Sequence, residues 1–296
     1  MNNLPHPTYE ATHPFVLTDE NYYSNEADRE YLSCSQIDAF EACEAAAYAK
    51  LQGRYTPPSS KAFIVGNYFH TAFESEEARE AFLIANEEHI FGRGGKKYAD
   101  FTQADKMIEV ALNDPAIKKL IDMPGDNEVI MTGKLFDDFL FKVRFDKYIP
   151  NEHRNMIIDW KTVANIWETK WSDFHGKKVT FVDMFGYMMR AAVYTEIERQ
   201  NSGRDLRAIF NLVCISKQDP PDKEIINMNN DQEMNLELER LYIKLNRIVS
   251  IKRGEVKPVR CGHCAYCRGT KKINRVLEAY QLEPGFRPER EDDYAI

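Results

Sequence analysis

The chain has 296 residues, of which 43% are hydrophobic and 29% charged, and a net charge of −8. This composition is ordinary for a folded soluble protein. The negative net charge weighs against a strongly basic surface for binding nucleic acid. No apolar run approaches the roughly 20 residues that span a bilayer, and the polar start (Met1 to His13) does not look like a signal peptide. We therefore expect no membrane association and a cytoplasmic location.

The first half of the chain is predicted to be mainly helical. Residues 1–31 lack periodicity and are interpreted as an N-terminal arm, extended in conformation. A helix is expected to begin near Ser35, with Asp38 three residues on as part of its cap. Helical segments are then predicted over 61–90 and 102–120.

Residues 127–162 are predicted to form strands, because apolar and aromatic residues alternate there with polar ones. Asp146 stands at the end of one alternating segment, in the run Lys-Val-Arg-Phe-Asp. A second apolar run, Met-Ile-Ile-Asp-Trp-Lys-Thr, contains Asp159 and Lys161. Residues i and i+2 of a strand point to the same face, so Asp159 and Lys161 are expected to share one site.

The rest of the chain continues in mixed α/β order. Residues 165–175 are expected to be a loop or short helix. The strongest later signals are a helix over 181–200, a buried strand over 207–216 and an amphipathic helix over 231–252. Strands in the middle with helices around them predict a single α/β domain over 32–283, followed by a charged tail at 284–296.

Asp146, Asp159 and Lys161 are the leading candidates for catalysis. Two carboxylates can hold Mg²⁺ or Mn²⁺, and such an ion can bridge a phosphate and activate a water molecule. The lysine would orient that water or neutralise charge that develops on the phosphate. Two carboxylates and a lysine in one site are typical of metal-assisted phosphodiester hydrolysis. The alternative is a surface ion pair at the ends of two strands.

Two helical pairs could complete such a site. His70 and Glu74 have i, i+4 spacing, and an imidazole could join the metal ligands, although a lone helical histidine is usually structural. Arg190 and Tyr194 have the same spacing and suit a phosphate or an active-site carboxylate. An exposed arginine beside a core tyrosine is an equally good interpretation of this second pair.

Three of the six cysteines, Cys261, Cys264 and Cys267, fall within the seven-residue run Cys-Gly-His-Cys-Ala-Tyr-Cys. In a cytosolic chain this density favours a tetrahedral metal or an iron–sulfur cubane over disulfides. A fourth ligand could come from Cys43 or Cys34, since ligation by His263 inside the cluster is sterically awkward. A reduced cluster without a metal is the alternative.

Taken in order, these residues resemble the PD-(D/E)xK nuclease superfamily, and within it the phage and prophage exonuclease VIII (RecE)-like group. The resemblance covers residues 33 to about 217. It rests on Gly66 to His70, then Asp146, then Asp159 with Lys161, then Arg190 to Tyr194. It implies a restriction-endonuclease-like core, with a central mixed sheet flanked by helices. It also implies that His70 and the backbone carbonyl of Trp160 join the two aspartates at the metal.

The chain departs from this family at Arg190, where the family usually has glutamine. Arginine cannot accept a hydrogen bond, so a direct phosphate contact is the expected role here. Related nucleases also join one cysteine of an N-terminal helix to three near the C-terminus on a [4Fe–4S] cluster. Cys43 occupies the matching place and Cys34 does not. The C-terminal spacing is tighter than the usual pattern, so zinc stays open as the alternative.

The resemblance implies a metal-dependent exonuclease that resects double-stranded DNA ends 5′-to-3′ in phage recombination, within a bacterial host cell. It further implies a single-strand annealing protein as partner and a ring-like homo-oligomer. Alternatives are an endonuclease or end-trimming nuclease of the same fold, and a non-catalytic DNA-binding module. A redox role for the cysteines alone leaves the carboxylates unexplained.

Overall fold

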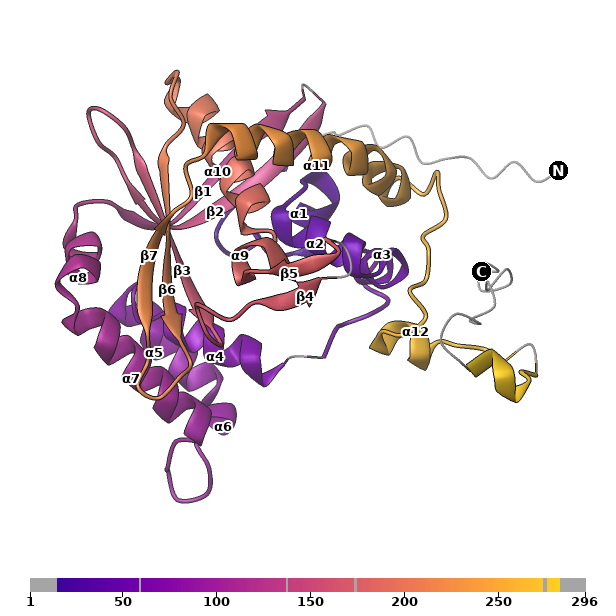
Figure 1. Ribbon diagram of the computed structural model, residues 1–296, viewed down its shortest axis with the longest axis horizontal. Helices are drawn as coiled ribbons and strands as arrows, with labels where there is room; N and C mark the ends of the chain where they lie inside the picture. Colours follow the sequence, from indigo (N-terminus) through magenta and orange to yellow (C-terminus); the bar gives the residue numbers. More distant parts are fainter. Residues whose placement is uncertain (1–14, 59, 137, 173–174, 274–275, 283–296) are drawn as a thin grey trace.

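A computed structural model describes residues 15–58, 60–136, 138–172, 175–273 and 276–282. A five-stranded sheet runs through the molecule with helices on both faces (Figure 1). This confirms the predicted α/β class with a central mixed sheet flanked by helices. Among the described helices, none has both the length and the apolar composition needed to cross a bilayer.

The sheet has the strand order β1-β2-β3-β6-β7, in which only β3 and β6 run parallel. A parallel pair needs a crossover connection, and helix α10 lies in the connection between these two strands. A separate two-stranded sheet, β4 with β5, precedes α10. The strand bounds are β1 Asp126–Leu135, β2 Phe139–Ile149, β3 Met156–Val163, β4 Lys170–Ser172, β5 Lys177–Val179, β6 Ile209–Ser216 and β7 Lys223–Asn227.

Each face of the sheet has its own hydrophobic core. One lies under α2 (Cys34–Ala42), α3 (Glu44–Leu51), α9 (Phe181–Met184), α10 (Tyr187–Ser202) and α11 (Asp231–Lys252). The other lies under α4 (Lys61–His70), α5 (Glu76–Ala85), α7 (Ala99–Asn113) and α8 (Pro115–Asp122). The remaining elements are α1 (Asn25–Glu30), α6 (Glu87–Ile90), α12 (Ala265–Gly269) and a 3₁₀ turn at Ala279–Leu282.

Strand β3 obeys the predicted alternation. Ile157 packs in the core under α10, whereas Ile158 and Trp160 pack in the core under α4 and α7. Its neighbour β2 does not alternate throughout. Phe145 lies in the core under α10, yet Lys147, two residues on, donates to the carbonyl of Ile121 on α8 at 2.6 Å. The facing of β2 therefore shifts by one residue at Asp146.

The sheet also opens at this point. Pairing between β2 and β3 covers Lys147–Ile158 to Ile149–Met156 and stops there. Beyond the last pair, the carboxylate of Asp146 accepts the backbone N–H of Trp160 at 2.7 Å and takes the place of a ladder hydrogen bond. The alternation of β2 ends at Asp146 as predicted, although the strand itself continues to Ile149. The residue marks a kink in the strand.

Several predicted boundaries are also wrong. Segment 61–90 is three helices, and 102–120 is interrupted where Asp114 caps a new helix that starts with Pro115. Segment 181–200 is divided at Gly186, whose φ of 61° is left-handed. Ser33, rather than Ser35, caps α2 by accepting the N–H of Gln36. Strands β4, β5 and β7 were not predicted, and β4 falls within the segment 165–175 that was expected to be a loop or short helix.

The N-terminal prediction needs one correction as well. Asn25–Glu30 is a helix rather than part of an extended arm. Ser24 caps it, and Asp28 forms an ion pair of 2.8 Å with the buried Lys142 of β2. An ion pair therefore holds this helix on the sheet. Such a contact produces no apolar periodicity from which the helix could be predicted. Residues 1–14 and the predicted charged tail at 284–296 lie outside the described residues.

Candidate active site and cysteine cluster

The four residues predicted to share a cation site do lie together, at the place where β2 and β3 separate. His70 is the last residue of α4, and its Nδ1 lies 3.4 Å from Oδ2 of Asp146 on β2. On β3, Lys161 Nζ lies 2.5 Å from Oδ2 of Asp159 and 3.9 Å from Oδ2 of Asp146. Helix α4 and the two consecutive strands β2 and β3 thus contribute to one pocket.

The Lys161 ammonium is surrounded by oxygen atoms. It donates to the backbone carbonyl of Trp160 at 3.0 Å, in addition to its contacts with the two aspartates. The carbonyl of Trp160 therefore faces the pocket, as expected for a metal ligand. These are the same three oxygen donors that we expected around a divalent cation, so the ammonium lies in an environment already suited to positive charge.

The pocket opens on its histidine side. Exposed side-chain surface increases from 4% for Asp159 to 16% for Asp146 and 26% for His70. Asp159 is thus the most deeply buried of these side chains, and His70 is the most exposed.

Electrostatics fits these positions. Burial lowers the pKa of His70 although the charge of Asp146 opposes the shift, so the imidazole is neutral and able to ligate a metal. Burial raises the pKa of Asp159, against the effect of Lys161. For Lys161, burial alone would lower the pKa, but Asp159 and Asp146 outweigh it and raise the pKa, so the lysine remains an ammonium.

The donor set suits Mg²⁺ or Mn²⁺. It offers two carboxylates, one carbonyl and one neutral imidazole, and hard divalent cations favour such oxygen-rich sets. Oδ2 of Asp159 is buried against the Lys161 ammonium at 2.5 Å. A divalent cation bound here would therefore share this carboxylate with the lysine or displace it.

Glu74 does not share a helix face with His70. Helix α4 ends at His70, and Glu74 follows in a turn where its backbone carbonyl accepts a hydrogen bond from Asn127 at 2.6 Å. The predicted i, i+4 geometry is therefore wrong, because the helix stops one turn too early. Burial raises the pKa of Glu74, and Asp146 contributes to this shift.

Arg190 and Tyr194 lie in different environments on α10. Tyr194 is 8% exposed and packs against Phe145 and Phe210 in the core. The guanidinium of Arg190 lies 3.5 Å from Asp38 on α2 and packs over the ring of Tyr187. Burial alone would lower the pKa of Arg190, but Tyr194, Cys34, Asp159 and Asp38 outweigh it and raise the pKa.

Two charged neighbours were missed from the sequence. Asp38 was assigned only to a helix cap, but it contacts Arg190. Glu128 of β1 has an unusual φ of 56°, is skipped in the pairing of β1 with β2, and forms an ion pair with Arg144. Burial and then repulsion by Asp146 raise the pKa of Glu128 to about 7. No periodicity marks either residue, since both positions arise from tertiary packing.

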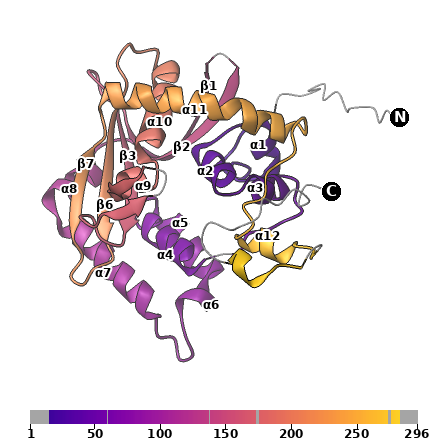
Figure 2. The same cartoon turned by 45° about the vertical axis from the view of Figure 1, so that its right-hand side comes forward.

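The cysteine prediction of one N-terminal and three C-terminal ligands agrees with the geometry. Cys43, at the junction of α2 and α3, and Cys261, Cys264 and Cys267 place all four sulfur atoms within 4.8 Å of one another. Figures 1 and 2 show α12, which contains Cys267, beside α3. We call these four residues the cysteine cluster. Cys34 is instead buried in the core under α10.

His263 does not face the sulfurs. Its Nδ1 lies 2.9 Å from the carbonyl oxygen of Cys261, and the residue is exposed. Burial alone would raise the pKa of the Cys261 thiol, but hydrogen bonds from the backbone of His263 and Cys264 outweigh it and lower the pKa to about 6. A thiolate suited to metal binding is thus favoured at this position.

The fold and the pocket define the class of protein. A mixed sheet in which one strand carries an aspartate, the next carries Asp-x-Lys and a helix adds a histidine is the arrangement of a PD-(D/E)xK nuclease. Residues 33–270 match the family model described as a PDDEXK-like domain of unknown function (DUF3799), and the chain belongs to this family. No curated protein matches the chain.

Among solved structures, a candidate exonuclease from Eubacterium rectale is similar, with 35% identity and a TM-score of 0.83. The match covers 92% of this chain and all of that one. The structure of SSO0001 matches at 15% identity over 68% of this chain and 83% of that one, with a TM-score of 0.27, which is too low to support an argument.

Proposed function

We propose that the protein is a divalent-metal-dependent DNA exonuclease that hydrolyses phosphodiester bonds at double-stranded ends. The convergence of His70, Asp146, Asp159 and Lys161 in one pocket supports this function most directly. The family and the name of the similar Eubacterium rectale protein agree with it.

In this proposal, His70, Asp146, Asp159 and the Trp160 carbonyl hold the metal. When bound, the ion would polarise the scissile phosphate and lower the pKa of a water molecule. Asp146 is held in place because one of its oxygens already accepts the Trp160 N–H. Lys161 contacts both carboxylates and remains charged. Its ammonium could turn from them to contact a phosphate oxygen or a water molecule.

Arg190 is proposed to bind the DNA backbone. Its guanidinium contacts Asp38 at 3.5 Å, lies over the ring of Tyr187 and interacts electrostatically with Asp159. Guanidinium groups suit phosphate oxygens, which this residue could contact beside the metal. Tyr194 would act by supporting α10 from the core, since its ring packs against Phe145 and Phe210.

The biological setting is proposed from the exonuclease VIII-like resemblance. It comprises 5′-to-3′ resection in phage recombination, in the cytoplasm of a bacterial host, with a single-strand annealing protein as partner. A homo-oligomer would favour processive digestion. Digestion of linear duplexes labelled separately at the 5′ and 3′ ends tests the polarity.

Asp159→Ala and Lys161→Ala test the catalytic proposal. Each should abolish Mg²⁺-dependent degradation of linear DNA while the circular dichroism spectrum is kept. Asp122→Ala and Lys118→Ala are matched controls, because these residues form an exposed aspartate–lysine pair of 2.9 Å on α8, away from the pocket. Unchanged activity in both pocket variants would end the hypothesis.

Covalently closed circular DNA separates the alternatives. An exonuclease leaves a closed circle intact, whereas an endonuclease of the same fold degrades it. A non-catalytic DNA-binding module would degrade neither substrate and would show no binding of Mg²⁺ or Mn²⁺ in a calorimetric titration.

A further inference from the structure

The spacing of the sulfur atoms in the cysteine cluster distinguishes between the two kinds of metal centre considered for it. Sγ of Cys43 lies 3.6 Å from Sγ of Cys267, which in turn lies 3.9 Å from Sγ of Cys261. All four sulfurs lie within 4.8 Å of one another. The four atoms therefore form one small, closed group.

A single tetrahedral ion requires this spacing. With zinc–sulfur bonds of about 2.3 Å, tetrahedral geometry places the sulfurs about 3.8 Å apart. In a [4Fe–4S] cubane each cysteine binds a different iron atom, so the sulfurs must stand farther apart to enclose the larger cluster. We infer that the cysteine cluster binds one soft tetrahedral ion, zinc in the cell, and that a [4Fe–4S] cluster does not fit it.

The backbone of the Cys-Gly-His-Cys-Ala-Tyr-Cys segment is already folded around such an ion. The N–H of Cys264 donates to Sγ of Cys261 at 3.3 Å, and the N–H of Cys267 donates to Sγ of Cys264 at 3.4 Å. Gly262 has a φ of 78°, which a side chain would strain. These donors neutralise part of the charge that four thiolates bring to a dication.

The fourth ligand is positioned independently of the ion. Cys43 directly precedes Glu44, which accepts the N–H of Val259 at 2.7 Å and pairs with Arg247 through both carboxylate oxygens at 2.5 and 2.8 Å. The N–H of Ala45 also donates to the carbonyl of Val259 at 3.1 Å. The segment that leads into the cysteine run is thus already held against α3.

The role of the ion follows from its ligands. Four cysteines fill a tetrahedral shell and leave no position open for water or substrate, which is the mark of a structural site. The site joins the α2–α3 junction to the segment that follows α11. The ion would therefore stabilise the packing of the two ends of the domain without taking part in hydrolysis.

Metal analysis of the full-length protein, purified without oxygen from cells supplied with both iron and zinc, tests the inference. We expect one zinc per chain, no acid-labile sulfide and no broad visible absorption. Replacement of zinc by Co²⁺ should give the visible bands of tetrahedral cobalt–thiolate coordination. Iron and sulfide in equal amounts, or failure to take up either Zn²⁺ or Co²⁺, would overturn the inference.

Variants assign the ion to these residues. Cys267→Ala should lower the zinc content at least tenfold. Cys214→Ala, which removes a buried cysteine of the core, should retain zinc and is the matched control. If Cys267→Ala does not fold, Co²⁺ spectra of the unaltered protein still decide the coordination. These measurements do not depend on nuclease activity, so they can fail while the proposed function stands.

Discussion

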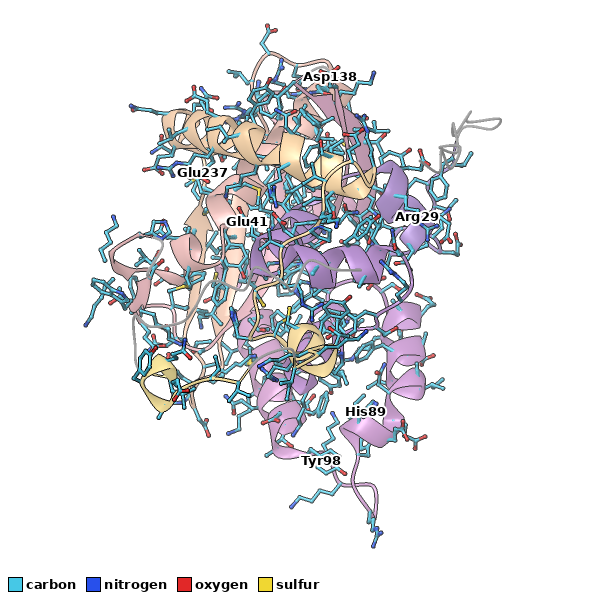
Figure 3. All side chains as sticks on the ribbon, turned by 90° about the vertical axis from the view of Figure 1, so that its right-hand side faces the viewer. Arg29, Glu41, His89, Tyr98, Asp138 and Glu237 are labelled. Carbon is cyan, nitrogen blue, oxygen red and sulfur yellow. The ribbon has the colours of Figure 1, made fainter. Side chains whose placement is uncertain are left out.

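The pocket around Lys161 and the cysteine cluster are built from different kinds of donor atoms. The pocket offers hard oxygens and an imidazole where two central strands part, and Lys161 provides a positive charge among them. The cluster gathers four sulfurs where the C-terminal segment meets α3. In Figure 3, Asp138 and Glu237 lie in the upper part of the view, and His89 and Tyr98 lie in the lower part.

The comparison shows how the charge already present at a site affects how tightly a metal ion can bind there. Lys161 lies 2.5 Å from one aspartate and 3.9 Å from the other, so the pocket is partly neutralised by the protein itself. An ion that enters must compete with this ammonium, which favours weak, exchangeable binding. Thiolates supported by N–H donors favour tight binding instead. The three predictions below can sharpen or break this contrast.

The largest effect is expected for Asp146→Asn. Asparagine keeps an oxygen that can accept the Trp160 N–H but removes a metal-binding charge. Activity on linear DNA should fall by about 10²–10³-fold, whereas zinc content should not change. Normal activity would contradict the proposed role of Asp146, and loss of zinc would show that the two sites are not separate.

Glu128→Gln should have an intermediate effect, on stability and only at higher pH. The folded-state pKa of Glu128 is raised from 4.5 to about 7, so the folded protein holds this proton over a pH range in which the unfolded chain releases it. The free energy of unfolding therefore decreases as pH rises from 4.5 to 7, and the loss is complete above 7. The variant should be more stable than the unaltered protein at pH 8, by about 2 kcal/mol.

Urea unfolding at pH 4 and pH 8 measures this difference. Near pH 4 the glutamate is protonated in both states, so its contribution to the difference between the two proteins should vanish. Glu88→Gln, at an exposed position of α6, is a control for the change in charge. An equal stability difference at both pH values would mean that the ionisation of Glu128 does not cause it.

The smallest effect is expected for Arg190→Gln. Removing a cation beside Asp159 should strengthen Mg²⁺ binding without DNA by about fivefold, which corresponds to about 1 kcal/mol, and should weaken DNA binding. Arg199→Gln, at a partly exposed position of the same helix, should change neither. Calorimetric titration with Mg²⁺ and then with a short duplex measures both. Weaker Mg²⁺ binding in Arg190→Gln would contradict the charge argument.

Features that depend on motifs and on the local pattern of residues could be predicted from the sequence. Features that depend on tertiary contacts could not. The order of His70, Asp146, Asp159 and Lys161 predicted the pocket, and the period of β3 predicted that Asp159 and Lys161 meet. The kink at Asp146 could not be predicted, because it exists only through pairing with β3 and contacts with two helices. Asp38 and Glu128 escaped notice for the same reason.

The cysteines show the same limit in another way. Their spacing predicted a metal centre and, through the resemblance, Cys43 as its distant fourth member. Distances between sulfur atoms were needed before one ion could be distinguished from a cubane. Residue types indicate the chemistry of a site, whereas its size is a property of the folded chain.

The ammonium of Lys161 has a consequence for how the enzyme is turned on. A pocket that carries its own positive charge is partly neutralised before any metal ion binds. The polyanionic DNA end would bring the extra negative charge that releases the lysine from the carboxylates and admits the cation. Substrate and metal ion would then complete the pocket together.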